Sequence, residues 1–301
     1  MTGLGIGLDR LDQRRVMVAS GCGGTGRELT PYLDLAELGG FVTRSITLDA
    51  RAGAGGRRVA ETPSGLLNAI GLQNPGLEAF LALELPWLVK QGARVFVSVA
   101  GATLGEYADL ARRLGRAPGL HGLEVNLSAP DPVGQHVFDV REPFHAASVV
   151  AACRREFPRD LPVLAKLRPD VGRIVEAART VTEAGADAVV LGNAVPALMP
   201  DGRPAGLSGP AIRPIALRSV ADVHAALPDV PLIGAGGITS ADDARAFLAA
   251  GAIAIQVGTA LLHDPTTAQR LVDELGADAP EDAPEDDRED DREDDPRGEG
   301  G

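Results

Sequence analysis

The chain has 301 residues, of which 45% are hydrophobic, and this fits one large globular domain better than two of ordinary size. It contains no run of about 18 uncharged apolar residues and no signal-peptide pattern at its start, so we expect no membrane partner and a cytoplasmic location. Its two cysteines, Cys22 and Cys153, share no metal-ligand spacing, which argues against both a disulfide framework and a metal site.

The net charge of −13 is concentrated at the end of the chain. Asp278–Gly301 holds 13 acidic residues and three arginines, so it carries −10 while residues 1–277 carry only −3. This segment lacks aromatic and β-branched residues, so we expect a disordered acidic tail at 277–301 after one barrel domain at 1–276. A solubilising role for the tail is favoured over a docking role. The nearly neutral remainder argues against nucleic acid as a partner.

Short apolar runs alternate with longer helical patterns along the chain, which is typical of repeated βα units. Eight such runs predict a closed (β/α)8 TIM barrel of the α/β class. The predicted strands are Val16–Ala19, Gly40–Thr47, Arg94–Ala100, Gly122–Ser128, Pro162–Leu167, Ala188–Asn193, Pro231–Gly236 and Ala254–Gly258.

The connections between these strands differ in length. The second strand is followed by Arg51–Pro86, a segment rich in Gly, Pro and Asn that we expect to be a long insertion covering the barrel mouth. A helix is predicted over Pro143–Phe157, with Phe144 in its row of apolar residues. Ser240 is predicted to cap a helix over Ala241–Ala250.

Glycine-rich turns follow the last two predicted strands, at the end where barrels of this kind place active-site groups. Gly234–Ser240 ends the seventh strand, Gln256–Ala260 ends the eighth, and each leads into a helix. Glycines allow backbone N–H groups to approach an anion, and a helix N-terminus favours negative charge. The pattern therefore favours a phosphate-bearing ligand over tight turns alone.

Two polar residues in apolar surroundings are further candidates. Lys166 is one of only two lysines among 29 basic residues, and it interrupts the apolar run Val163–Leu167. A partly buried ammonium that hydrogen-bonds a ligand is favoured over a structural ion pair, and flavins use such a cation near N1. Asn68 lies in the glycine-punctuated run Gly65–Gly76, where it can grip a planar ligand or simply form a turn.

A set of ordered segments carries a family resemblance that runs from about residue 10 to residue 275. The segments are Val18–Gly21, Thr43–Leu48, Val59–Gly65, Leu67–Gly76, Glu124–Ser128, Ala165–Leu167, Gly206–Pro214 and Gln256–Ala260. Together they resemble class 1 dihydroorotate dehydrogenases, most closely the NAD-linked 1B type. The resemblance implies an FMN-containing barrel that oxidises dihydroorotate to orotate in pyrimidine biosynthesis, a homodimer, and a separate iron–sulfur and FAD subunit that carries electrons away.

Carried over position by position, the resemblance implies which residues hold each ligand. FMN contacts are expected from Ala19, Ser20, Arg44, Ser45, Asn126, Lys166, Gly209, Gly236, Gly237, Gly258 and Thr259. Contacts with the small-molecule substrate are expected from Asn68, Gly71, Leu72, Asn126 and Asn193.

The departures from the family pattern fall on the substrate side. The family's catalytic cysteine, the base that removes the C5 proton, is Ala129 here, and loss of a positioned base typically costs ~10²- to 10⁴-fold in rate. Asp131 puts a carboxylate where the family has an amide, and Arg44 replaces a lysine. These three are the predicted catalytic positions. Ser98 and Ala194 also differ from the family, and the loop at 195–204 is shortened.

Three interpretations follow from these departures. The chain is a dihydroorotate dehydrogenase with a substitute base, for which Asp131 and His136 are candidates, although a loop histidine is usually only solvated. Alternatively it is an FMN oxidoreductase with a pocket rebuilt for another substrate, or a non-catalytic flavin-binding paralogue. The sequence leaves all three open because fold does not fix function.

Overall fold

The computed structural model of the chain describes residues 8, 11, 14–128 and 142–277. Three of the positions discussed above, Ala129, Asp131 and His136, lie outside the described residues, as does the acidic tail from Asp278.

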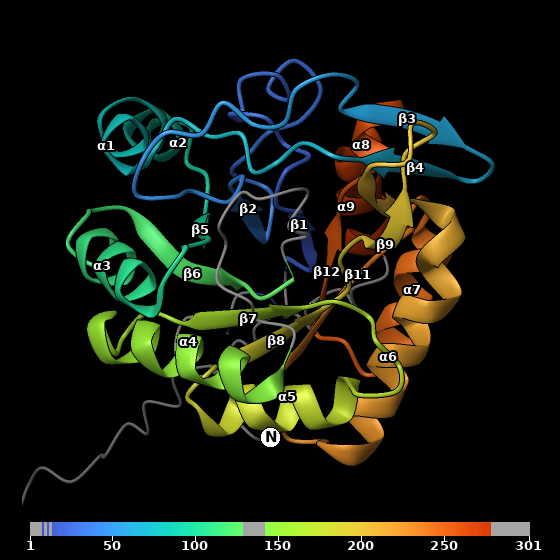
Figure 1. The fold of residues 1–301 in the computed structure, drawn as a ribbon. Coiled ribbons are helices and arrows are strands. Elements are labelled where there is room, and N and C mark those ends of the chain that lie inside the picture. The colour runs from blue at the N-terminus through green and yellow to red at the C-terminus, as the bar shows by residue number, and fades with distance from the viewer. Residues whose placement is uncertain (1–7, 9–10, 12–13, 129–141, 278–301) are drawn as a thin grey trace, which may run out of the picture.

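Eight parallel strands close into a barrel, which confirms the predicted (β/α)8 fold (Figure 1). Around the barrel the order is β1, β12, β11, β8, β7, β6, β5, β2, with β2 paired back to β1. Each strand overlaps its predicted range. The strands are β1 (Val16–Val18), β2 (Gly40–Val42), β5 (Val95–Val99), β6 (Leu120–Asn126), β7 (Val163–Leu167), β8 (Ala188–Leu191), β11 (Leu232–Ala235) and β12 (Ala254–Val257).

Helices cover the outside of this barrel, as Figure 1 shows for α3 to α7. After β2 the chain forms a helical stretch from three short elements, α1, the π-helix η2 and α2, with Pro86 in the first turn of α2. Among the described residues the helices are α1 (Leu77–Ala79), η2 (Phe80–Glu84), α2 (Leu85–Lys90), α3 (Leu104–Leu114), α4 (Pro143–Glu156), α5 (Ile174–Glu183), η3 (Pro210–Ile212), α6 (Arg213–Ala226), α7 (Ala241–Ala249), α8 (Ala260–His263) and α9 (Thr267–Gly276).

Alternation along each strand separates two cores. Outward residues such as Val97 and Val125 pack against the helices, whereas inward residues such as Phe96 and Leu164 fill the barrel with Leu8 and Leu11 from the N-terminal segment. Polar residues take over the inward positions toward the C-terminal strand ends. Those polar inward positions are Ser98, Glu124, Asn126, Lys166 and Gln256. The barrel interior is thus packed with apolar side chains, here called the apolar plug, up to its C-terminal end, where buried polar side chains form the floor of the barrel mouth.

A separate four-stranded antiparallel sheet stands beside the mouth, with the strand order β3, β4, β10, β9. Its strands are β3 (Val59–Thr62), β4 (Gly65–Asn68), β9 (Val195–Leu198) and β10 (Pro204–Ser208). Two segments are more regular than expected. The insertion at 51–86 includes the strands β3 and β4 of this sheet, and the segment at 195–204 contributes β9 and the start of β10 to it. Asn68 accordingly ends a strand instead of lying in a loop.

One local helix prediction is confirmed and one is wrong. Ser240 caps α7 as predicted, because its side chain accepts from the Asp243 N–H and the Asp243 carboxylate accepts in return from the Ser240 N–H. The buried face of α4 was predicted wrongly, since Phe144 is 75% exposed. The helix instead packs through Val149, Val150 and other small or β-branched residues.

Candidate functional site

Two adjoining cavities open at the C-terminal ends of the strands, one of about 400 Å³ and one of about 190 Å³. Every predicted ligand-binding residue lines at least one of them. Of these predicted residues, those that line only the larger cavity are Arg44, Ser45, Gly71, Leu72 and Asn126. Those that line only the smaller cavity are Ala19, Gly209, Gly236, Gly237, Gly258 and Thr259. Those that line both cavities are Ser20, Asn68, Lys166 and Asn193. The fold thus gathers into one site residues that are up to 240 positions apart.

The smaller cavity is built around glycines that other residues replace only with strain. Gly209, Gly236 and Gly237 have φ of +92°, +122° and +72°, and a Cβ on Gly237 would lie 2.7 Å from the carbonyl oxygen of Gly209. Within the part of the chain that the structure describes, the backbone N–H groups of Gly237, Gly258 and Thr259 donate to no protein acceptor. Such a group of N–H donors fits a phosphate.

The charged residues behind this turn neutralise each other. Arg213 forms an ion pair with Asp243 at 2.5 Å and also donates to the carbonyl oxygen of Gly237 at 3.4 Å. Burial alone would raise the pKa of Asp243, but hydrogen bonds from Thr239 and Ser240 and the nearby Arg213 charge lower it overall. With Arg213 engaged by a carboxylate, the backbone supplies the anion donors at this turn.

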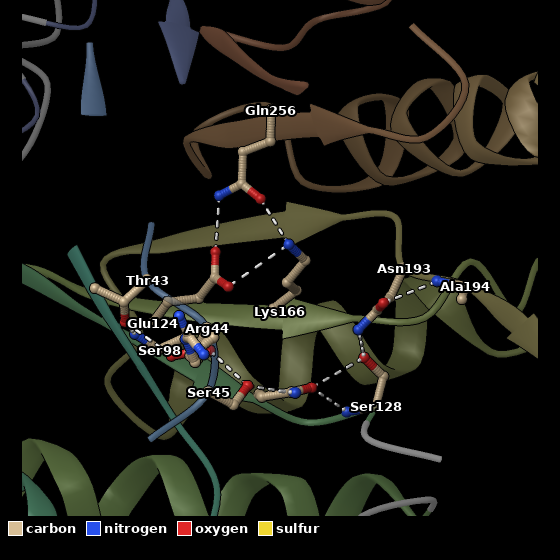
Figure 2. Close-up of polar contacts among 11 residues, drawn as sticks. Thr43, Arg44, Ser45, Ser98, Glu124, Ser128, Lys166, Asn193, Ala194 and Gln256 are labelled. Carbon is tan, nitrogen blue, oxygen red and sulfur yellow. Dashed lines mark hydrogen bonds and ion pairs between the residues drawn. The ribbon is translucent and has the colours of Figure 1, made fainter. Parts of the chain in front are cut away.

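Lys166 stands at the floor of both cavities in a buried cluster with two residues that sequence analysis did not single out, Glu124 and Gln256 (Figure 2). Its ammonium donates to Gln256 Oε1 at 2.6 Å and lies 3.5 Å from Glu124 Oε1, while Gln256 Nε2 donates to Glu124 Oε2 at 2.7 Å. Lys166 therefore makes an ion pair and also faces the cavities. The sequence signal that was missed is Glu124 itself, a charged residue within an apolar strand. It lies two positions before Asn126 and therefore on the same face of β6.

A chain of hydrogen-bonded side chains crosses the wall of the larger cavity (Figure 2). Ser98 and Ser45 share a hydrogen bond of 2.9 Å, and Asn126 Nδ2 donates to Ser45 at 2.9 Å. At the far end Asn193 Nδ2 donates to Ser128 Oγ at 2.6 Å. Each member fixes the orientation of the next, so the amides of Asn126 and Asn193 are held in defined directions. The hydroxyl of Ser98 is satisfied at this buried position by its bond to Ser45.

Arg44 supplies a second cation to the larger cavity, in addition to Lys166. Its Nε is buried and has no hydrogen-bond partner among the described residues. Burial would raise the pKa of Glu28, but its own hydrogen bonds, including those from Thr25, and the charge of Arg44 lower it. Burial raises the pKa of Glu84, an effect that Arg44 partly offsets. The positive charge of Arg44 thus acts on two carboxylates, those of Glu28 and Glu84. Glu28 also lines the larger cavity, which the sequence did not indicate.

The insertion provides the opposite wall. Asn68 Nδ2 donates to the carbonyl oxygen of Gly206 across the β4–β10 pair at 3.2 Å. Leu72 has φ of +54°, an uncommon conformation for leucine, and follows Gly71 with φ of +73°. Asn74 holds the turn, donating to the carbonyl oxygen of Leu72 at 2.8 Å and to Thr47 Oγ1 at 2.9 Å. The strained backbone is thereby fixed beside the cavity.

Cys22 lines the smaller cavity, but its thiol is not in the reactive thiolate form at neutral pH. Burial of its sulfur raises the pKa of the thiol to about 11, although the charge of Lys166 opposes that rise. The thiol therefore stays protonated at neutral pH, and packing is the better account of this residue.

The residues present fit FMN on three grounds. The glycine turns offer free N–H donors for a phosphate, Lys166 offers a buried cation, and the larger cavity offers oriented amides. Of the residues that the structure describes, no helix is long and apolar enough to cross a membrane, and no group of three or more His, Cys, Asp or Glu is placed to hold a metal.

The fold and site define an α/β barrel with a phosphate cradle and an adjoining amide-lined pocket at its strand ends. Comparison with known proteins is specific: residues 13–278 match the family model of dihydroorotate dehydrogenase. The chain belongs to the dihydroorotate dehydrogenase family, among the catalytic subunits of the NAD-linked 1B class.

Individual relatives support this assignment along most of the chain. The catalytic subunit of dihydroorotate dehydrogenase B (NAD(+)) from Anoxybacillus flavithermus is 43% identical over 271 residues, covering 87% of this chain and 86% of that protein. Those from Pelobacter propionicus and Desulforudis audaxviator are 45% and 46% identical, with 85% and 86% of this chain and 86% and 87% of theirs covered.

Proposed function

We propose that this chain binds FMN and, with it, oxidises dihydroorotate to orotate. The observation that carries the proposal is the division of the site into a cradle of free backbone donors and an adjoining pocket of oriented amides, joined by Lys166. The names of the relatives, catalytic subunits of dihydroorotate dehydrogenase B, support the same reaction.

In this reaction the substrate loses a hydride and a proton and gains a carbon–carbon double bond. Bound FMN supplies the acceptor for the hydride and its two electrons. The chain orients the substrate through the amides of Asn68, Asn126 and Asn193 and offers Arg44 to its carboxylate. Because Asn126 and Asn193 are already hydrogen-bonded in fixed directions, little ordering remains when the substrate binds.

Removal of the proton is the step that this chain supports least, because Ala129, at the position of the family's base, cannot accept a proton. We therefore expect turnover slower by ~10²- to 10⁴-fold than in a relative with a positioned base. The same substitution, together with Asp131, Ser98 and Ala194, favours a second candidate function, an FMN oxidoreductase for another ring substrate.

We also propose that electrons leave through a separate subunit with an iron–sulfur cluster and FAD, and that the catalytic chain forms a homodimer. The relatives' designation as catalytic subunits supports a multi-subunit enzyme, and two cysteines are too few for a four-cysteine iron–sulfur cluster in this chain.

The test is an anaerobic absorbance titration of the FMN-reconstituted protein with dihydroorotate. Bleaching of the flavin band is expected, and a band that stays oxidised would exclude this substrate. Reduction by a different ring substrate would then support the second candidate, while reduction by none would indicate a non-catalytic flavoprotein.

A double substitution shows whether the chain has lost only its catalytic base or has a pocket that no longer accepts dihydroorotate. If the rest of the site is competent, Ala129→Cys with Asp131→Asn should raise the rate of flavin reduction by dihydroorotate by ~10²-fold or more. No gain would mean that Arg44, Ser98 or Ala194 also excludes the substrate.

A further inference from the structure

A carboxylate lies beneath the proposed flavin site without facing it. Glu124 is fully buried and lines neither cavity, whereas its partners Lys166 and Gln256 line the smaller one. All three side chains point into the barrel from β6, β7 and β12 and meet above its apolar plug (Figure 2). The carboxylate is therefore hidden behind the ammonium that meets the ligand.

Packing alone does not account for this cluster. A buried ion pair is costly to desolvate, and apolar residues of similar volume can often replace it without loss of stability. The pairing is also incomplete, because Glu124 Oε1 has no hydrogen-bond partner among the described residues and lies 3.5 Å from the ammonium. Lys166 keeps one short bond, to Gln256, and has further N–H donors for the cavity.

We infer that Glu124, linked through Gln256, is a positioning residue that offsets the charge of Lys166 and so lowers the electron affinity of the bound flavin. The inference rests on the proposed function, because it requires FMN beside Lys166. A lone ammonium there would stabilise negative charge on the reduced flavin, whereas a carboxylate 3.5 Å behind it cancels part of that field. The cluster would hold the flavin at a potential from which electrons can pass onward to a partner.

The first test measures how tightly the oxidised flavin binds sulfite, because positive charge near the ring's N1 side favours this anion. Glu124→Gln should strengthen sulfite binding by about tenfold or more and raise the reduction potential. Glu124→Asp, which keeps the charge, should stay close to the wild type. Asp187→Asn removes a carboxylate from the ion pair with Arg154 and should change neither value.

A second readout needs no flavin. Because Lys90 and Lys166 are the only lysines, a ¹³Cε-lysine spectrum of the apoprotein has two signals. Glu124→Gln should move the Lys166 signal and leave that of exposed Lys90 unchanged.

The outcomes separate the two claims. Wild-type protein that takes up no FMN would overturn the proposed function and the tuning with it. Flavin-loaded Glu124→Gln protein with unchanged or weaker sulfite binding would overturn this inference alone, whatever its thermal stability.

Discussion

At the scale of single residues, the glycines of the phosphate cradle carry the sharpest prediction. Gly237→Ala places a Cβ 2.7 Å from the Gly209 carbonyl oxygen at φ of +72°, so the backbone must move to relieve the contact. We expect FMN affinity to fall by ~10-fold or more and stability by about 1–2 kcal/mol. Fluorescence titration with FMN and urea unfolding give the two values.

The matched control is Gly202→Ala, which has similar strain at φ of +84° but nothing within 4 Å of the added Cβ and no place in either cavity. It should show the stability loss with unchanged FMN affinity. If both variants bind FMN equally well, the turn at Gly237 does not hold the phosphate.

Cys22 gives a second prediction at this scale. Because burial raises the pKa of its thiol to about 11, the thiol stays protonated below that pH and should react with iodoacetamide at pH 7.5 far more slowly than free cysteine. Reactivity should rise only as the pH approaches 11. Mass spectrometry of the apoprotein measures this, and rapid labelling at pH 7.5 would show that the sulfur is a reactive thiolate.

At the scale of elements, the capping box of α7 anchors the turn that carries Gly236 and Gly237. Asp243→Ala removes the acceptor for Thr239 and Ser240 and the partner of Arg213, so we expect the free energy of unfolding at pH 7 to fall by about 1–2 kcal/mol. The native pKa of Asp243 is lowered, so its stabilisation is complete above the unfolded pKa near 3.8 and is lost as the pH falls through the lower native value.

Urea unfolding of both proteins across this pH range tests the prediction. Asp242→Ala is the control, because that carboxylate is 92% exposed and pairs with Arg245 at the surface. A difference between wild type and Asp243→Ala that does not shrink in acid would mean that the carboxylate's charge is not what stabilises the turn.

The elements also show where sequence reasoning succeeds. The barrel strands were predictable because each is a short apolar run whose outward residues pack on helices. The sheet beside the mouth was not, because β10 pairs with β4 across a separation of 138 residues, and no local pattern encodes that contact. The buried face of α4 was wrong for a similar reason, since packing between α3 and α5 decides it and leaves Phe144 outside.

The same distinction holds for the site. The residues predicted to contact FMN or the substrate all line the two cavities, because strand ends in a closed barrel converge whatever their spacing in sequence. The predicted catalytic positions Ala129 and Asp131 lie outside the described residues. Glu124 and Gln256 were missed because they act behind Lys166, and only the packing of three strands brings them together. Arg44 was identified, but its two carboxylate neighbours, Glu28 and Glu84, became apparent only from the structure.

At the scale of the whole molecule, charge and structure are divided along the chain. The body to residue 277 carries −3 and contains the barrel and both cavities, whereas 278–301 carries −10. A nearly neutral barrel has little repulsion between copies, and added acidic residues favour solubility. We therefore expect a chain ending at residue 277 to keep its melting temperature within about 2 °C, because the segment removed contains no aromatic or large aliphatic side chain.

The same truncation should keep FMN affinity unchanged but lower solubility, most strongly at low salt near the isoelectric point of the shortened chain. Solubility by precipitation with polyethylene glycol, a thermal melt and an FMN titration are the three measurements. Replacing 278–301 with an unrelated acidic segment of equal charge should restore solubility if charge alone matters. If the replacement fails where the native tail succeeds, the tail's sequence matters, and the docking role becomes the better account of it.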